Sequence, residues 1–420
     1  MPGTPNVLDL VHRSCSEVAA LHAEHVRIDD AAVSELAAEL AAAADDVRCA
    51  VRGLPLPIKF SSLEQELTLL ALYHLLDFGS GYDKQLRRLP GGRDARETLL
   101  YGLIGLHLGG TRLDHHKLKS FSMYDIHQVF GIEATVEVPV MPGVTMAKPG
   151  PLQPLCKLLL AALHEAGALL EAQGARTPGE LLMALCEGLQ QAGRTTASAF
   201  VEELVDTIPA FRDAVLYDGR TLTLHRKAQN LAADLAVVYG SRDKRFAFSD
   251  VAQLAADSGA TTIAVLRAKG VLRLSEELAG VIDGGSELPA GPHERALRAA
   301  AVTACDRLAA AAAAGTGAAS RQGDEPASAV APPSDGGEVA TAAAAAAADK
   351  ETEGPAAEAE AVTGGGGGGG QPAEEGAGGG AAAGSFRAVD VGAYLSYLAE
   401  EGRELYGKVT KHITTGIMAY

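Results

Sequence analysis

Apolar residues recur at intervals of three and four along most of the chain, which is the spacing of one face of an amphipathic helix. Two such series follow recognisable helix starts. Asp29 and Asp30 precede the first, and Ser61 with Glu64 forms a capping box before the second. The two series are Val33, Leu36, Leu40 and Leu67, Leu70, Tyr73, Leu76. Both patterns predict helices.

The same period predicts helices over most of the remaining chain. We expect them at 93–108, 122–130, 152–172, 178–192, 197–207, 226–239, 250–256, 263–269, 276–282 and 294–308. One short hairpin interrupts them, because residues 214–217 and 221–224 flank Asp218-Gly219, a dipeptide that favours a tight turn. The predicted fold class is mainly α with one short β-hairpin, in a single domain of two helical lobes.

A low-complexity segment separates residues 1–308 from residues 386–420. Between 309 and 385 the chain consists of alanine runs, a glycine run and scattered Pro, Ser and Glu, with almost no large apolar residue. Such a composition cannot offset the entropy lost on ordering. We therefore expect a long disordered insertion at 309–385, after which residues 386–420 return to the domain formed by residues 1–308.

The net charge is −17, with 36 Lys and Arg against 53 Asp and Glu. This balance, without a Lys/Arg-rich helix, argues against a protein that binds nucleic acid directly. The five cysteines are widely spaced and form no C-x-x-C pair, which favours a reducing compartment over a disulfide framework. Neither a signal peptide nor an apolar run long enough to cross a bilayer is recognisable. We expect a cytoplasmic protein without membrane contact.

Three common enzyme signatures are absent: the phosphate-binding G-x-x-x-x-G-K-[ST] loop, a G-x-G-x-x-G loop after a strand, and the G-x-S-x-G elbow. The close histidine pairs His22/His25 and His115/His116 lack the spacing of metal ligands on a helix. Most of the common enzyme classes therefore lose support.

The most informative polar cluster lies between residues 208 and 257. It contains Ile208-Pro-Ala-Phe-Arg-Asp213, the hairpin, a helix that begins Arg226-Lys227-Ala-Gln, and a stretch that ends at Asp257. Cations at the start of a helix oppose its dipole. Arg226 and Lys227 therefore indicate either a bound anion such as phosphate or a solvated helix face.

The order of these pieces resembles the queuosine salvage proteins, a family of queuosine 5′-phosphate N-glycosylase/hydrolases. That family has an aromatic-Pro-x-aromatic-Arg-Asp stretch, a short hairpin, a Lys-Arg-Ala-Gln helix with a later Asp, and an Ala-Asp-Tyr-Arg-x-Pro segment. The resemblance covers nearly the whole chain outside the insertion. It includes His25-Val-Arg-Ile-Asp29, Leu76-Asp-Phe-Gly-Ser-Gly-Tyr82, Gly270-Val-Leu-Arg-Leu-Ser275 and the aromatic Tyr420.

The resemblance implies a helical fold related to helix-hairpin-helix glycosylases, in which a catalytic Asp follows a Lys-bearing helix. Breaking an N-glycosidic bond develops positive charge on the ribose, and a carboxylate can stabilise that charge while it orients the attacking water. The resemblance gives this role to Asp257, with Asp234 as a second carboxylate for the substrate's amine or diol. The alternatives are a helix cap for Asp257 and a structural ion pair for Asp234.

The resemblance also implies a substrate-binding set. Phe78 and Tyr82 are candidates for stacking on the flat base, or else are core aromatics. Asp77 stands where the family has Asn and can pair with the cationic amine of queuine. The phosphate requires cations. The residues proposed for it are Arg226, Lys227, Lys411, His412 and Tyr420, and Arg212 and Asp213 complete the set. A plain surface role is the alternative for Lys411 and His412.

Two departures from the family affect the expected pocket. After Asp257 the chain reads Ser-Gly-Ala-Thr-Thr-Ile in place of Tyr-Arg-x-Pro-Gln. It also contains no Trp, which the family has near the positions of Asp77 to Tyr82 and in the C-terminal helix.

Three hypotheses follow. The first is a hydrolase that cleaves queuosine 5′-monophosphate to queuine and ribose 5-phosphate for tRNA queuosine salvage, with this nucleotide as its partner and no metal or organic cofactor. The second is a DNA/RNA glycosylase-like nucleic-acid-binding protein. The third is a catalytically inactive helical scaffold.

Overall fold

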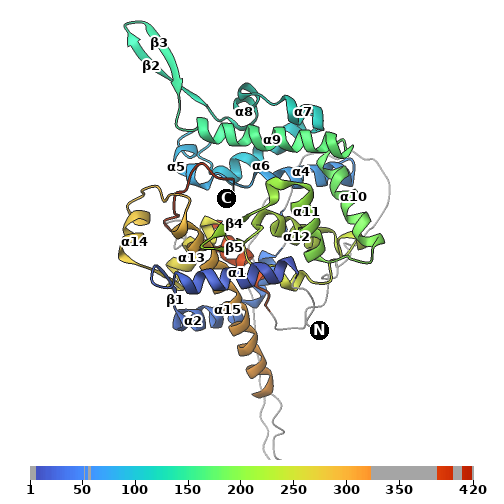
Figure 1. The fold of residues 1–420 in the computed structure, drawn as a ribbon, viewed down its shortest axis with the longest axis vertical. Helices are drawn as coiled ribbons and strands as arrows, with labels where there is room; N and C mark the ends of the chain where they lie inside the picture. Colours follow the sequence, from blue (N-terminus) through green and yellow to red (C-terminus); the bar gives the residue numbers. More distant parts are fainter. Residues whose placement is uncertain (1–5, 52, 55–57, 323–385, 401–408, 419–420) are drawn as a thin grey trace, which may run out of the picture. The chain divides into compact units, whose positions relative to one another are not determined.

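The computed structural model describes residues 6–51, 53–54, 58–322, 386–400 and 409–418, with the backbone alone for 315–322 and 400. In these residues the fold is mainly helical (Figure 1), which confirms the predicted class. Tyr420 and most of the expected insertion lie outside the described residues.

The helices account for most of the described chain. They are α1 (Val7–Leu21), α2 (Asp30–Ala42), α3 (Ala44–Ala50), α4 (Leu63–Leu76), α5 (Asp83–Leu86), α6 (Ala95–Leu108), α7 (His115–Ser120), α8 (Met123–Phe130), α9 (Gln153–Gln173), α10 (Pro178–Gln191), α11 (Ala197–Thr207), α12 (Arg226–Tyr239), α13 (Ala260–Ala268), α14 (Glu276–Asp283), α15 (Pro292–Gln322) and α16 (Ala388–Glu400). Short 3₁₀ turns are η1 (Ser80–Tyr82), η2 (Pro209–Phe211), η3 (Lys244–Phe246) and η4 (Val251–Gln253).

Most predicted helices are present, and their differences from the prediction have local causes. The helix expected at 250–256 is wrong, because only η4 forms there. The Asp250 carboxylate accepts hydrogen bonds from the backbone N–H groups of Ala197 and Ser198 at the start of α11, so this segment is held by α11. The predicted cap of α4 is also shifted by one residue, since Ser62 accepts from the Gln65 N–H at 3.3 Å.

Strands form three antiparallel pairs in the described chain, where one hairpin was predicted. The predicted hairpin is confirmed as β4 (Ala214–Tyr217) and β5 (Arg220–Thr223), and Asp218 and Gly219 turn between them with φ of 45° and 72°. The other two pairs are β1 (Val26–Ile28) with β6 (Leu272–Leu274), and β2 (Thr135–Met141) with β3 (Val144–Pro149).

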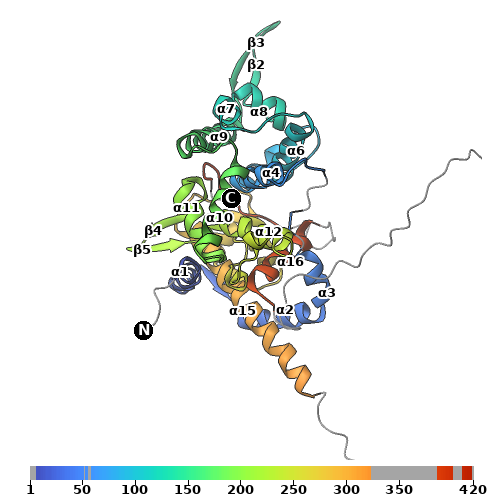
Figure 2. The same ribbon diagram turned by 90° about the vertical axis from the view of Figure 1, so that its right-hand side faces the viewer.

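The β2–β3 ribbon projects away from the helices in both views (Figures 1 and 2). Every residue of its strands is exposed except the half-buried Val138. The sequence does contain a signal for it, because Val136, Val138 and Val140 alternate with other residues before the turn dipeptide Pro142-Gly143. The prediction of a single hairpin did not use this alternation.

Helix α4 is the most deeply buried element, because every residue from Leu67 to Leu76 is shielded from solvent. Helices α6, α10 and α12 pack against it within the largest apolar cluster. A second cluster joins α2, α13, α15 and α16, and α15 also contributes to a third with α1 and β5. The boundary expected at residue 308 lies inside α15, whose Ala309 and Ala312 are buried in the second cluster.

Candidate active site

Three segments that are distant in sequence meet at the start of α12. They are the C-terminal end of α4, the first turn of α12, and the chain that precedes α13. Gln229 joins the last two, because its Nε2 donates to the Leu224 carbonyl at 2.7 Å and its Oε1 accepts from the Ala255 N–H at 2.9 Å. The chain enters α12 through His225, whose φ of 47° is left-handed. This turn directs the first side chains of α12 toward α4.

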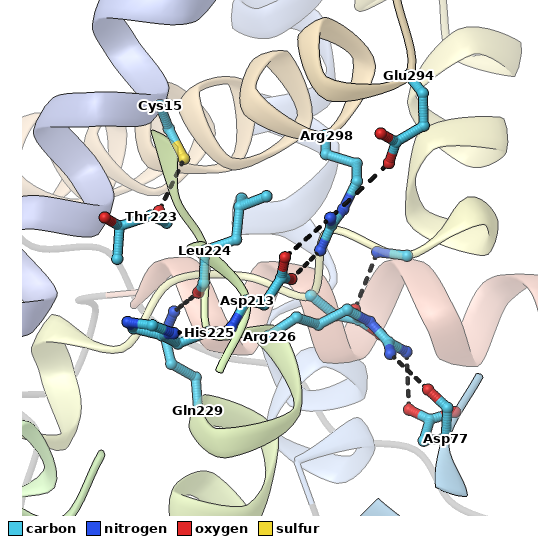
Figure 3. A network of polar contacts seen from close by, with 12 residues as sticks. Cys15, Asp77, Asp213, Thr223, Leu224, His225, Arg226, Gln229, Glu294 and Arg298 are labelled. Atoms are coloured by element: carbon cyan, nitrogen blue, oxygen red, sulfur yellow. Dashed lines mark hydrogen bonds and ion pairs between the residues drawn. The ribbon is translucent and has the colours of Figure 1, made fainter. Parts of the chain in front are cut away.

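Arg226 bridges two carboxylates. Its Nε donates to Asp257 Oδ1 at 2.5 Å and its Nη2 to Asp77 Oδ2 at 2.7 Å, while Nη1 donates to the Asp77 carbonyl at 3.0 Å (Figure 3 shows the contacts with Asp77). The side chains of Arg226 and Asp77 are 7% and 10% exposed, but that of Asp257 is 20% exposed. The structure therefore brings three predicted residues together, and Asp257 is the most accessible of them.

The charges of this group are unequal. Burial opposes ionisation of Asp77, but the Arg226 guanidinium outweighs it and lowers the pKa of the carboxyl. Burial likewise opposes the charge of Arg226, but Asp257 and Asp77 together raise the pKa of the guanidinium. Two carboxylates share the Arg226 guanidinium, and Asp257 is the more exposed of the two. Such a group suits the stabilisation of a cation.

Asp257 also orders the chain that follows it. Its Oδ1 accepts a hydrogen bond from the Gly259 N–H at 2.9 Å, one residue before α13 begins. A Cβ at position 259 would come within 3.2 Å of this oxygen and 3.3 Å of the Arg226 Nε. Gly259 itself is the N-cap of α13. The Asp257 carboxylate therefore holds the turn before this helix, and it contacts Arg226 at the same time.

Lys227 lies behind Arg226 in a nearly closed environment. It is 2% exposed, and its Nζ donates to the Leu75 carbonyl at 3.1 Å. The Phe78 and Phe211 ring centroids lie 5.5 and 6.0 Å from this nitrogen. Burial, reinforced by the nearby Arg226, lowers the pKa of the Lys227 amine to about 8. Phe78 itself is buried, so it forms a wall of this environment and not an exposed stacking surface.

Asp234 lies two turns along α12 from Arg226 and also faces α4. Its Oδ2 is 2.8 Å from His74 Nε2. The His74 side chain is 4% exposed, whereas that of Asp234 is 19% exposed. The helices run antiparallel here, because His74 contacts Asp234 while Asp77, the C-cap residue just after α4, contacts Arg226.

Asp213 belongs to a neighbouring buried network. Both of its carboxylate oxygens accept from Arg298 of α15, which also pairs with Glu294 at 3.7 Å (Figure 3). Burial opposes ionisation of Asp213, but Arg298 lowers the pKa of its carboxyl. Arg212, the preceding residue, points elsewhere: its exposed guanidinium pairs with Asp206 at 2.8 Å. The structure does not bring Arg212 to the Arg226 group.

The C-terminal segment 409–418 covers Tyr82. The Tyr82 hydroxyl lies within hydrogen-bonding reach of Thr415 and Gly416, and the residue is 4% exposed. Lys411 pairs with Asp83 at 3.5 Å. His412 is 2% exposed, so the alternative of a surface role is wrong for it. Tyr420 cannot be placed, because it lies outside the described residues.

Sequence reasoning missed several partners of the predicted residues, among them His74, Phe211 and Arg298. His74 had a usable signal, because it is the one histidine in the apolar run of α4 and lies one helical turn before Asp77. Arg298 had none, since its contact with Asp213 joins residues far apart in the chain.

Two features are absent from the part of the chain that the structure describes. In these residues, no group of three or more His, Cys, Asp or Glu is arranged to hold a metal ion. No helix in that part of the chain combines the length and hydrophobicity needed to cross a membrane.

Known proteins resemble the part of the chain that contains most of the residues of this site. A family model described as "Queuosine salvage protein" matches residues 111–331. The chain is also similar to the queuosine 5′-phosphate N-glycosylase/hydrolase of Sphaerobacter thermophilus, with 32% identity over 123 residues. That alignment covers 29% of this chain and 38% of the relative, so it spans well under half of the relative's length. The family match includes Arg226, Asp234 and Asp257, and Asp77 lies before it.

Proposed function

The chain belongs to the queuosine salvage protein family, and on that premise we propose that it hydrolyses the N-glycosidic bond of queuosine 5′-monophosphate. The bond between ribose C1′ and the base nitrogen breaks, and its electron pair leaves with the base. Water adds its oxygen to C1′, and the proton balance is completed by protonation of the base. The products are queuine and ribose 5-phosphate.

The position of Asp257 is the observation that carries this proposal. Its carboxylate is one-fifth exposed, lies inside the family match, and is held by the Arg226 Nε, while Asp77 holds the other side of the same guanidinium. An oxocarbenium-like ribose in the transition state would be stabilised by the negative charge of this carboxylate, and the same carboxylate can orient water. We assign the catalytic role to Asp257 on this basis.

We propose that Asp234 and Asp77 recognise the base, through its cationic amine or its diol. The phosphate is proposed to bind beside Arg226 and Lys227. Stacking of the base on Phe78 or Tyr82 remains a prediction, and it requires that these buried rings become accessible.

We also infer that the helical fold is a glycosylase-like domain related to helix-hairpin-helix proteins. The arrangement of α12 supports it, because this helix carries Lys227 and is followed by Asp257 before α13 begins.

The direct test is incubation of the purified full chain with queuosine 5′-monophosphate, with queuine and ribose 5-phosphate measured by mass spectrometry. We expect both products in equal amounts. Asp206→Asn is a suitable control, because Asp206 is an exposed carboxylate that pairs with Arg212. No release of queuine by the wild-type chain would overturn the proposal and favour an inactive scaffold. Salt-sensitive binding to a polynucleotide would instead favour a nucleic-acid-binding protein.

A further inference from the structure

His74 is a polar residue in the most apolar helix of the fold. It lies within the buried run Leu67–Leu76 of α4, and its ring is 4% exposed. Burying a polar ring is costly unless its nitrogens are hydrogen-bonded. One of them is, because Nε2 lies 2.8 Å from Asp234 Oδ2. This contact therefore accounts for the presence of a histidine in α4.

The chemistry of a carboxylate sets the direction of that hydrogen bond. An ionised carboxylate only accepts, so Nε2 must carry the hydrogen. The other nitrogen, Nδ1, is buried and has no hydrogen-bond partner among the described residues. Nε2 therefore makes the ring's hydrogen bond within the described residues, and this bond is directed at Asp234.

Asp234 is exposed to a different degree from its partner. Its side chain is 19% exposed, against 4% for His74. The histidine therefore holds the carboxylate from the buried side, while part of the carboxylate remains accessible. The eight-residue step from Arg226 to Asp234 corresponds to about 12 Å along α12. This span is comparable to the length of a deazapurine base with an extended substituent.

We propose that His74 is a positioning residue, which orients Asp234 for binding the cationic amine on the substituent of the base. The inference deepens the proposed function and rests on it. With Asp257 acting at the ribose, Asp234 then recognises the far end of the same base. A histidine that merely joined α4 to α12 would affect stability, whereas a positioning histidine affects the affinity for the amine.

Three variants separate these roles. His74→Leu keeps a buried apolar volume but removes the donor, and His74→Gln keeps a donor near the position of Nε2. Asp234→Asn can still accept from Nε2 but has lost the negative charge. His164→Leu is a matched control, because the Nε2 of His164 on α9 also lies close to a protein oxygen, the Phe121 carbonyl at 2.7 Å. Thermal midpoints are measured for each variant, so that loss of fold is recognised.

The measurement is the dissociation constant for queuine and for the same deazapurine lacking the amine-bearing substituent. We expect His74→Leu and Asp234→Asn each to weaken queuine binding about tenfold and to leave the unsubstituted base unchanged. His74→Gln should recover most of the affinity. In a double-mutant cycle, the variant with both His74→Leu and Asp234→Asn should bind queuine no more weakly than Asp234→Asn alone. With queuosine 5′-monophosphate, KM should rise more than turnover falls.

Several outcomes would overturn the inference while leaving the proposed function intact. In each case the wild-type chain cleaves the nucleotide. The inference fails if the effects of the two substitutions on queuine binding are additive, or if the variants lose equal affinity for both bases. It also fails if the folded His74→Gln and His74→Leu variants bind queuine as tightly as the wild type. A wild-type chain that neither cleaves the nucleotide nor binds queuine would overturn the proposed function, and this inference with it.

Discussion

Arg226 serves two carboxylates, and this sharing determines the charge around Asp257. If Asp257 were its sole partner, the guanidinium would neutralise the charge that a cationic transition state needs. Asp77 takes up part of that positive charge from the buried side, at 2.7 Å from Nη2. Asp257, at 2.5 Å from Nε, then keeps net negative character while its orientation is fixed. This division suits a carboxylate that must be both charged and positioned.

Replacement of Asp257 tests that reasoning directly. Asp257→Asn keeps the size of the side chain and much of its hydrogen bonding but removes the charge. We expect turnover to fall about a thousandfold, which corresponds to about 4 kcal/mol in the barrier. Binding of queuine should change far less, because the charge acts mainly in the transition state. Single-turnover cleavage and queuine affinity measure the two effects. A near-normal rate here, with an inactive Asp234→Asn, would reverse the assigned roles.

Lys227 provides a test of the phosphate hypothesis. If its Nζ exchanges the Leu75 carbonyl for a phosphate oxygen, Lys227→Ala should weaken the monophosphate about ten- to a hundredfold, since charge-assisted bonds contribute about 1.5–3 kcal/mol. The nucleoside should be hardly affected. Competition binding of both ligands provides the comparison. Equal weakening of both would instead assign Lys227 to holding α12 against α4, as its burial between two Phe rings permits.

His412 should make stability depend on pH. Burial, with help from Arg298 and Arg267, lowers the pKa of its ring to about 3. The unfolded chain binds this proton near pH 6.5, so stability is fully present above that pH and is lost as the pH falls toward 3. Between pH 6.5 and 5.0 the loss should be about 2 kcal/mol. Most carboxylates titrate below this window.

Urea unfolding at these two pH values checks the His412 prediction. The pH-dependent loss should shrink in His412→Gln, and histidines elsewhere should contribute equally to both proteins. The same loss in the variant and the wild type would contradict the prediction.

At the scale of elements, the C-terminal segment is held by backbone contacts that leave little room. Leu288 N–H donates to the Ile413 carbonyl at 2.7 Å, and Thr414 Oγ1 donates to the Leu288 carbonyl at 2.9 Å. The Thr414 carbonyl oxygen lies directly against Gly81, so a Cβ there would overlap it. The absence of a side chain at Gly81 therefore permits the docking of this segment over η1.

Gly81→Ala should displace the segment. Overpacking of this kind costs about 1–3 kcal/mol, so we expect a lower thermal midpoint and faster amide exchange in residues 409–418. The matched control is Gly105→Ala on α6, where a Cβ meets nothing within 4 Å. That change should stabilise the protein by about 0.5–1 kcal/mol, because alanine favours the helix. Unchanged exchange in Gly81→Ala would show that the segment adapts.

Elements with local signals were predictable from the sequence, whereas those set by distant contacts were not. The bounds of α12 at Arg226 and Tyr239 match the prediction, since the helix follows a hairpin with a strong Asp218-Gly219 turn. The failure at Asp250 has the opposite cause, because its carboxylate is engaged by the start of α11. No local pattern indicates such an interaction.

The same distinction applies to the site. The sequence and the family resemblance indicated Asp257, Asp234, Asp77 and Arg226 but not the contacts among them, and His74 was missed as the partner of Asp234. The contact between Arg226 and Asp77 joins two segments 149 residues apart, and it gives the cation a carboxylate partner where phosphate or solvent was expected. Residue types indicate possible chemistry, but tertiary packing decides which charges are neutralised.

At the scale of the whole molecule, α15 links the packing of the described chain. Ala296 and Leu297 lie in the apolar cluster with α13 and α16, while Ala299 and Val302 lie in the cluster with α1. Arg298 on the same helix binds Asp213 beside the site. The helix continues to Gln322, and Ala312 is 1% exposed. The predicted insertion boundary at 308 therefore needs to be tested in relation to this helix.

Two deletions make that test, each joined by a flexible Gly/Ser linker. Removal of residues 323–384 takes away only the alanine- and glycine-rich sequence after α15. We expect the thermal midpoint and the activity to stay nearly unchanged, because loop-closure entropy depends weakly on length and this composition cannot form a core. Removal of residues 312–384 also deletes the buried Ala312 and the end of α15. It should lower the midpoint by several degrees.

The comparison of the two midpoints locates the functional edge of the domain. Each kcal/mol of lost stability corresponds to a shift of about 2–4 °C for a domain of 150–250 residues, and to less for a larger one. A shift confined to the longer deletion therefore assigns residues 312–322 to the folded domain and the rest to the insertion. Equal midpoints would show that α15 beyond residue 311 adds no stability. Lost activity after the shorter deletion would show that the alanine- and glycine-rich segment takes part in function.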